Sequence, residues 1–161
     1  MTLDLGQHVR GLLDVNRYLT LGTVNSDGSP WTSPVFFAAA GEWEFYWLSD
    51  LEAQHSRNIA VNPQVSLVVF DSTVLPYHGR AVYAAGTARE LAGDDIDRAL
   101  EIYPGPETRG VSRFALADVT GPSPYRLYQV TASDLWVLCP REPRQPCELH
   151  GLAKDHRARV E

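Results

Sequence analysis

The residue types best suited to chemistry are concentrated in one short stretch, where Gln54, His55, Arg57 and Asn58 occur within five positions. Helical spacing over residues 53–61 places them on a short helix. Free N–H groups near a helix start, together with the planar guanidinium of Arg57, suit an anion such as phosphate. His55 adds positive charge only where its pKa is raised. The alternative is structural, because a short helix needs polar residues on its solvent side and Asn58 can fix a turn.

Other candidate ligand contacts lie on neighbouring predicted strands. The hydroxyls of Thr32, Ser33 and Ser49 are either ordinary strand side chains or contacts to a ligand around which the strands bend. Trp47 and Trp136 could provide the flat apolar wall that a planar ligand needs. The chain contains no nucleophile elbow, metalloprotease, phosphate-loop or dinucleotide-binding motif. No catalytic side chain is therefore identified, and an enzymatic reaction would depend on a cofactor.

Four potential metal ligands occur near the C-terminus: Cys139, Cys147, His150 and His156. Their spacing matches no familiar zinc pattern, so the sequence predicts no metal site. Two thiols also cannot build a disulfide framework, and reduced cysteines favour a cytoplasmic protein.

The charge balance argues against two classes of partner. The chain carries 14 basic and 20 acidic residues, for a net charge of -6, and Lys154 is its only lysine. General affinity for nucleic acid or anionic lipid requires clustered basic side chains. The N-terminal stretch lacks the pattern of a signal peptide, and no apolar run approaches the length of a membrane span. We expect a soluble cytoplasmic protein whose ligand is a small molecule.

Periodicity predicts a mainly β protein of six or seven strands, arranged as a barrel or curled sheet with short helices at its openings. Pro34 is expected at an edge or a bulge because it has no N–H for a ladder, and Gly86 at a bend or a close backbone approach. The predicted helices are 7–17, 53–61 and 93–103; the predicted strands are a three-stranded meander over 18–49, a strand at 64–70 buried on both faces, a longer strand at 80–91 and a final pair of segments over 125–138.

The chain is expected to form one domain over residues 1–139. The segment 140–161 is polar and rich in Pro and Arg, which is typical of a tail or of an arm that orders on a partner.

The order of these elements resembles the pyridoxamine 5′-phosphate oxidase-like family of FMN-binding split barrels, over roughly residues 8–138. The most specific segments are RNIAVNPQVSL and GTAREL, supported by DGSPWTSPVFF, FYWLSD and the closing YRLYQVTASDLWVL. The resemblance implies a six-stranded antiparallel split β-barrel with short flanking helices. It also implies a homodimer that holds FMN in two grooves at the subunit interface.

The resemblance further implies a set of cofactor-binding residues. Backbone groups of two strands would follow the flavin ring, the helix after them would meet the phosphate, and a tryptophan of the partner subunit would flank the ring. The implied residues are Ser33, Pro34, Val35, Leu48, Ser49, Gln54, His55, Arg57 and, from the partner, Trp136.

The chain departs from the oxidase at the phosphate. Cationic positions of the oxidase correspond to Ser33, Ala38 and Gln54, and each lost charge-assisted hydrogen bond removes about 1.5–3 kcal/mol. Arg57, or Arg141 and Arg144 in the C-terminal segment, could compensate. The Arg-x-His motif that binds substrate in the oxidase has no clear counterpart. The sequence therefore predicts that pyridoxamine phosphate is not the substrate.

Three functions stay open at this point. The first is an FMN-dependent oxidoreductase of unassigned substrate. The second is a non-catalytic or differently specific protein that binds deazaflavin (F420), haem or another planar ligand, with His55 as a groove residue or axial ligand. The third is a barrel without a cofactor that serves as an interaction module.

Overall fold

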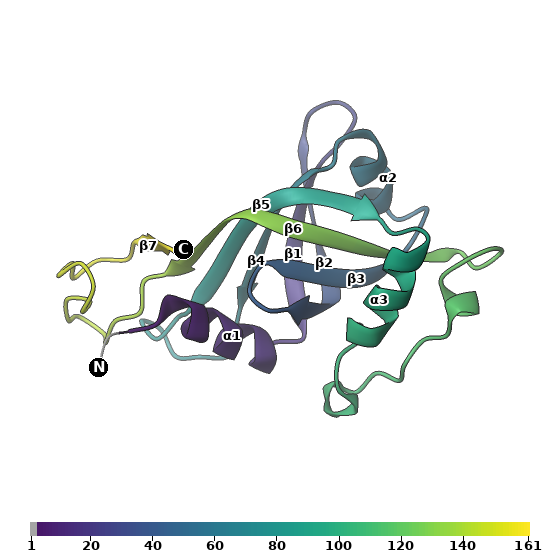
Figure 1. Ribbon diagram of the computed structural model, residues 1–161. Coiled ribbons are helices and arrows are strands. Elements are labelled where there is room, and N and C mark those ends of the chain that lie inside the picture. Colours follow the sequence, from purple (N-terminus) through teal and green to yellow (C-terminus); the bar gives the residue numbers. More distant parts are fainter. Residues whose placement is uncertain (1–2) are drawn as a thin grey trace.

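Six antiparallel strands close into a barrel in the computed structural model, which describes residues 3–161 (Figure 1). The sheet runs in the order β3-β2-β1-β4-β5-β6-β7, and an additional pairing of β3 with β6 closes the barrel. The strands are β1 (Tyr18–Val24), β2 (Pro30–Ala40), β3 (Glu44–Asp50), β4 (Gln64–Phe70), β5 (Ala81–Glu90), β6 (Tyr125–Leu138) and β7 (Arg157–Arg159). The expected six-stranded antiparallel split β-barrel is confirmed, with β7 added at the free edge of β6.

Three short helices flank the barrel at separate places (Figure 1). They are α1 (Leu5–Val15), α2 (Gln54–Val61) and α3 (Asp94–Ile102). The side chain of Asp4 accepts a hydrogen bond from the N–H of Gln7 and so begins α1. Three aspartates in the first turn of α3 complement its helix dipole. All three predicted helices are present.

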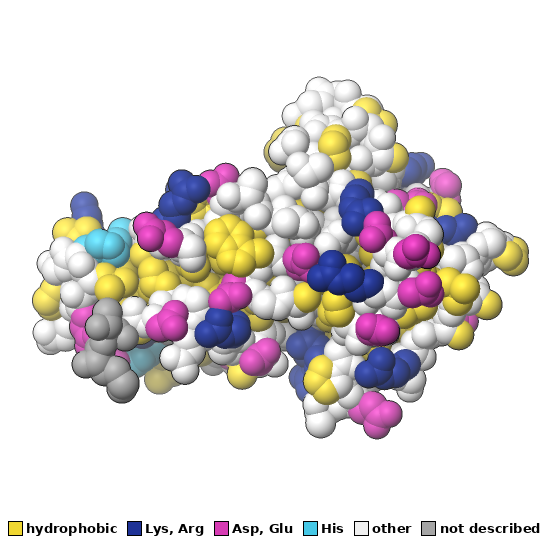
Figure 2. Space-filling view, viewed as in Figure 1, with side chains coloured by type: hydrophobic (Ala, Val, Ile, Leu, Met, Phe, Trp, Pro, Cys, Tyr) yellow, Lys and Arg dark blue, Asp and Glu magenta, His cyan; other side chains and the backbone are white. Residues whose placement is uncertain are grey.

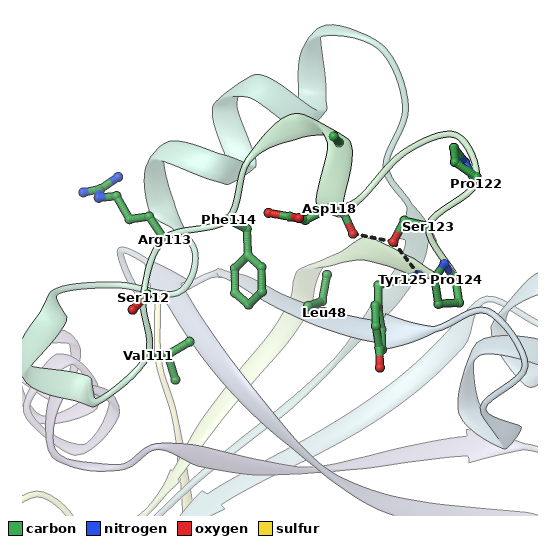
Figure 3. A pocket seen from close by; sticks show the side chains of 11 residues that line it. Leu48, Val111, Ser112, Arg113, Phe114, Asp118, Pro122, Ser123, Pro124 and Tyr125 are labelled. Atoms are coloured by element: carbon green, nitrogen blue, oxygen red, sulfur yellow. Dashed lines mark hydrogen bonds between the residues drawn. The ribbon is translucent and has the colours of Figure 1, made fainter.

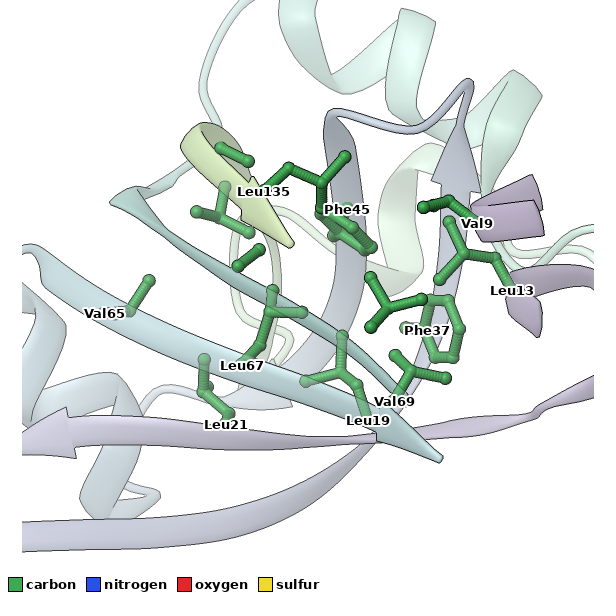
Figure 4. Close-up of a cluster of buried hydrophobic side chains, with 14 of the residues drawn as sticks. Val9, Leu13, Leu19, Leu21, Phe37, Phe45, Val65, Leu67, Val69 and Leu135 are labelled. Carbon is green, nitrogen blue, oxygen red and sulfur yellow. The ribbon is translucent and has the colours of Figure 1, made fainter. Parts of the chain in front are cut away.

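Alternate residues of the barrel strands point inward and form the main core (Figure 4). Two residues of α1, Val9 and Leu13, close one end of this core. A second apolar cluster lies on the outer face of β2 and β3, where α3 packs over Ala38 and Tyr46. The sheet is therefore covered on its outside at α3 as well as filled on its inside.

The prediction that strand 64–70 is buried on both faces is wrong. In β4, the buried residues Val65, Leu67 and Val69 alternate with Gln64, Ser66 and Phe70, which are exposed. A barrel strand has one face toward the core, and the other face of β4 is not covered by the same chain. The dense apolar run thus marks an outer surface with apolar character.

The barrel opens between β2 and β3. Residues Phe37–Ala40 pair with Glu44–Trp47, whereas residues Pro30–Phe36 pair with β1 alone. The first half of β2 is consequently a sheet edge, as predicted for Pro34, whose missing N–H would interrupt a central strand.

Gly86 also occupies the kind of position that the sequence predicts. The β5–β6 register shifts between Ala85 and Gly86, and a Cβ at Gly86 would overlap the carbonyl oxygen of Thr131. The final pair of strand segments is instead one continuous strand, β6, which bends at this bulge opposite Gly86.

The segment 140–161 returns to its own barrel. β7 pairs with Trp136–Leu138 of β6, and Ala158 and Val160 are buried. These contacts place β7 on the barrel of its own chain, and the division of the chain at residue 139 stays a prediction. Among residues 3–161, no helix has the length and apolar character needed to cross a membrane.

Candidate functional site

The end of β3 and the start of α2 are joined by a direct side-chain contact. Ser49 Oγ lies 2.7 Å from Nε2 of His55, and the Ser49 side chain is buried. Burial lowers the pKa of His55 below its ordinary value of 6.5. The imidazole is therefore neutral at pH 7, so His55 offers hydrogen bonding rather than positive charge to a ligand.

Gln54 and Asn58 belong to a hydrogen-bond network that ties α2 to the β1–β2 turn. Gln54 Nε2 donates to Oδ1 of Asn58 at 2.9 Å and to Oδ1 of Asn25 at 3.3 Å. Asn58 Nδ2 donates to Thr23 Oγ1 and to Asn25 Oδ1, both at 2.9 Å. The structural interpretation of Asn58 is thus supported. The partners Thr23 and Asn25 carried no sequence signal beyond the turn composition.

Arg57 is the cation beside this network. Its guanidinium is largely exposed and approaches Glu52 only to 4.0 Å. It lines an open cavity of about 280 Å³ together with Ser26, Gln54, Asn58 and Val61. This geometry leaves the guanidinium available to an anionic group.

Ser33, Pro34 and Val35 lie on the edge portion of β2. Ser33 Oγ accepts a hydrogen bond from Trp31 Nε1 at 3.0 Å, Pro34 is exposed and the Val35 side chain is buried. Continuing the register that pairs Phe37 with Trp47 would place Val35 opposite Ser49. The pairing itself ends at Phe37 and Trp47, so the two implied sets of backbone contacts lie on strands that part from each other at the opening of the barrel.

Leu48 points to the outer face of β3 and lines a cavity of about 960 Å³ (Figure 3). In Figure 3 Leu48 lies between the rings of Phe114 and Tyr125, and the loop that carries Ser112 and Arg113 lies on the Phe114 side, away from Tyr125. A volume of this order accommodates a drug-sized ligand. Sequence reasoning did not identify the loop over residues 111–124, because no periodicity or motif distinguishes it from an ordinary connection.

Trp136 lies in a different groove from the residues above. It lines a cavity of about 450 Å³ on the outer face of β1, β4, β5 and β6, with Tyr83 beside it and the guanidinium of Arg157 5.2 Å from its ring. Thr32 of the β2 edge lines the same cavity as Trp136, whereas Ser49 and His55 do not.

The phosphate-binding cations of the oxidase are not replaced at their own positions. Ala38 is buried beneath α3, so no charged side chain can project there, and Ser33 and Gln54 are neutral. On the face seen in Figure 2, basic side chains are dispersed among acidic ones. Near α2, Arg57 is the cation that the described geometry leaves available.

The structure brings together the four C-terminal residues that sequence spacing had set aside as metal ligands. Ligand atoms of Cys139, Cys147, His150 and His156, here called the Cys–His cluster, all lie within 4.8 Å of one another. Burial raises the pKa of Cys139 to about 11, with a contribution from Cys147. Burial also acts to raise the pKa of Cys147, but hydrogen bonds from the N–H groups of Leu152 and His150 outweigh it and lower that pKa to about 6.

Comparison with known proteins agrees with this architecture. The sequence profile of the pyridoxamine 5′-phosphate oxidase family matches residues 5–139. The split barrel and the matched profile define a class, and the chain belongs to the pyridoxamine 5′-phosphate oxidase family. A search of curated proteins found no match.

Several solved structures share the fold. A heme binding protein from Mycobacterium smegmatis has a TM-score of 0.70 at 16% identity, covering 99% of this chain and 60% of that chain. A putative 5-nitroimidazole antibiotic resistance protein from Bacteroides thetaiotaomicron has a TM-score of 0.67 at 14% identity, covering 85% of each chain. A protein described as F420 reductase has a TM-score of 0.55 at 23% identity, covering 78% of this chain and 94% of that chain. At these identities the similarity establishes the fold alone.

Proposed function

We propose that the protein is a homodimeric FMN-binding oxidoreductase that acts on a substrate other than pyridoxamine phosphate. The observation that carries this proposal is the edge portion of β2 at Ser33–Val35, which has no ladder partner on the side of β3. The other side of this opening carries Ser49, whose hydroxyl contacts His55 in the first turn of α2. A planar cofactor with polar ring edges suits such a combination of free backbone groups and a neutral side-chain pair.

Different residues would contact the ring and the phosphate of FMN. The N–H of Phe37 donates to the carbonyl of Arg17, so by the alternation of an antiparallel ladder the backbone groups of Ser33 and Val35 point to β1 and those of Thr32 and Pro34 point to the free edge. The ring edge would therefore be met by Thr32 and by Pro34, which offers only its carbonyl oxygen. Arg57 would meet the phosphate at the other end. FMN supplies hydride acceptance when bound. The protein contributes orientation, and the cavity lined by Leu48 and Phe114 provides space for a substrate.

A second copy of the chain is part of the proposal. Trp136 shares the outer groove with Thr32 of the β2 edge, but none of Ser49, His55 and Arg57 lines that groove, so Trp136 would flank a cofactor held by those residues from a partner subunit. The groove is lined mainly by apolar parts of β1, β4 and β5, which supports burial against another surface.

A second candidate function is binding of a deazaflavin or haem. The specific observation in its favour is the loss of cations at Ser33, Ala38 and Gln54 together with the neutral state of His55. A ligand that depends less on phosphate contacts would tolerate that loss better than FMN does.

The deciding experiment is an absorbance scan of freshly purified protein followed by separate titrations with FMN, F420 and haemin, with the molar mass measured by light scattering. FMN bands, or a dissociation constant for FMN in the micromolar range or tighter, with a dimeric mass would support the first proposal. Saturable binding of F420 or haemin without FMN binding would replace it with the second. A monomer indifferent to all three ligands would contradict both.

A further inference from the structure

The most complete side-chain constellation outside the β2–α2 region is the Cys–His cluster. It lies at the end of β6 beside β7, the same end of the molecule at which Figure 1 places the C-terminus. The proposed FMN site uses none of its four residues.

Two backbone arrangements bring the cluster together independently. Where β7 begins to pair with β6, the N–H of Cys139 donates to the carbonyl oxygen of His156 at 2.9 Å, so these two residues are neighbours. Cys147 and His150 belong to a tight turn in which the N–H of Gly151 donates to the carbonyl of Cys147 and the N–H of Cys147 to the carbonyl of Leu152, both at 3.0 Å. The φ of +65° at Gly151 suits glycine at this turn.

The distances between the ligand atoms match a tetrahedral metal site. His150 Nδ1 lies 3.5 Å from Cys139 Sγ and 3.7 Å from Cys147 Sγ, and Cys147 Sγ lies 3.6 Å from His156 Nε2. The two imidazole nitrogens are 3.0 Å apart. A tetrahedron with Zn–S bonds of about 2.3 Å and Zn–N bonds of about 2.0–2.1 Å has S···N edges of about 3.6 Å and an N···N edge of about 3.3 Å. Four of the six edges thus agree with this tetrahedron, and the other two, from Cys139 Sγ to Cys147 Sγ and to His156 Nε2, are within 4.8 Å.

Outer hydrogen bonds orient the ligands for this role. His156 Nδ1 lies 2.8 Å from the carbonyl oxygen of Lys154. Since a carbonyl can only accept, Nδ1 carries the proton and Nε2 presents its lone pair to the cluster. The N–H of His150 donates to Cys147 Sγ at 3.3 Å, which stabilises a thiolate. Such partners of the second coordination sphere are typical of zinc sites.

We propose that Cys139, Cys147, His150 and His156 bind one zinc ion as a structural site. Two thiolates and two imidazoles in tetrahedral array favour zinc over magnesium or calcium, which take oxygen ligands. All four coordination positions are filled by the protein, so none is open to a substrate. A disulfide between the two free cysteines would leave both converging imidazoles without a role.

The zinc ion would fix the C-terminal segment onto the barrel. The cluster joins Cys139, directly after β6, to Cys147 and His150 in the middle of the connection and to His156, directly before β7. β7 begins with Arg157, whose guanidinium lies 5.2 Å from the ring of Trp136 and 6.0 Å from that of Tyr83. Metal binding would thereby hold the guanidinium of Arg157 in the outer groove.

The test measures metal content in the full-length chain, purified without a histidine tag and without chelators. Mass spectrometry of the elements is expected to find one zinc per chain. Cys147→Ser and His150→Ala should reduce that content at least about 100-fold at equal free zinc, a larger loss than removal of an outer partner causes. His78→Ala is the matched control, because His78 is an exposed histidine far from the cluster in sequence, and it should retain the zinc.

Cobalt substitution of the unaltered chain keeps the proposal testable if these variants misfold. A tetrahedral cobalt spectrum with a thiolate-to-cobalt charge-transfer band would support the site. Zinc retained by the folded Cys147→Ser variant, or cobalt binding without the charge-transfer band, would overturn the proposal. A Cys139–Cys147 disulfide in protein purified without oxygen would also overturn it. None of these measurements depends on whether the protein binds FMN.

Discussion

Ser49 Oγ and His55 Nε2 lie 2.7 Å apart, and their contact joins the C-terminal end of β3 to the first turn of α2. This contact fixes the helix at the opening of the barrel, where the edge of β2 has no ladder partner. The polar residues at the start of α2 therefore have a structural role in addition to any role in binding. His55 contributes a neutral imidazole to them.

We expect His55 to make the protein less stable in acid. Burial lowers the pKa of His55 in the folded state, whereas the unfolded chain titrates near the ordinary value of 6.5. The unfolded state thus binds the proton first, so this contribution to stability is complete above pH 6.5 and is lost as pH falls through the folded pKa. Denaturant unfolding at a series of pH values should show a smaller loss of stability in His55→Gln.

In His55→Gln the dependence of unfolding free energy on pH should be reduced but still present, because burial and the charge of Arg80 also lower the pKa of His8. His78→Gln serves as the control and should keep the full slope. An unchanged slope in His55→Gln would contradict the assignment.

Arg57→Ala should weaken FMN binding by about ten- to hundredfold, because a charge-assisted hydrogen bond contributes about 1.5–3 kcal/mol. Stability should be unaffected, since the Arg57 side chain is 59% exposed and its guanidinium lies 4.0 Å from the carboxylate of Glu52. Arg98→Ala is a matched control on α3, with a side chain 58% exposed. Titration by fluorescence quenching measures both. Equal affinities in the two variants would remove Arg57 from the phosphate site.

Asn58→Ala should lower the free energy of unfolding by about 1–3 kcal/mol, because it leaves the buried hydroxyl of Thr23 without its donor and removes two further hydrogen bonds, to Asn25 and from Gln54. Asn62→Ala is the comparison, since Asn62 makes one exposed bond to the N–H of Gln64. Its effect should be the smaller. Urea unfolding of the two variants in parallel provides the measurement, and a larger loss for Asn62→Ala would refute the network.

Gly86→Ala should destabilise the barrel by about 1–3 kcal/mol, because the new Cβ would overlap the carbonyl oxygen of Thr131 and the strands would have to move apart. Gly11→Ala offers the opposite case: nothing lies within 4 Å of its Cβ position, and alanine favours a helix interior by up to about 1 kcal/mol. Thermal unfolding should therefore shift in opposite directions for the two variants. A stabilised Gly86→Ala protein would show that the bulge tolerates a side chain.

Local pattern accounts for the parts of the fold that the sequence could predict. The meander over residues 18–49 and the helix at 54–61 each follow from periodicity and turn residues within a short window. Pro34 and Gly86 could be placed because each restricts the backbone in a way that its neighbours cannot change. The implied backbone contacts at Ser33–Val35 and Ser49 stay a prediction, because the pairing of β2 with β3 ends at Phe37 and Trp47.

Local sequence pattern could not predict contacts between segments that are far apart in the chain. The parting of β2 from β3 depends on β3 pairing with β6, more than 70 residues later in the chain. The Cys–His cluster depends on β7 pairing back onto β6, which sets Cys139 beside His156. The seven residues between Cys139 and Cys147 exceed the usual spacing of zinc-ligand pairs, so a motif search alone sets the cluster aside.

The unpaired edge of β2 has a consequence for the protein before it meets any ligand. A sheet edge with free N–H and C=O groups is a template on which a strand of another molecule can add, and such addition leads to aggregation. Pro34 lies in the middle of this edge and removes a donor from it. The edge thus stays open to a small molecule that needs only a few backbone contacts, while the continuous hydrogen bonding that a foreign strand requires is interrupted.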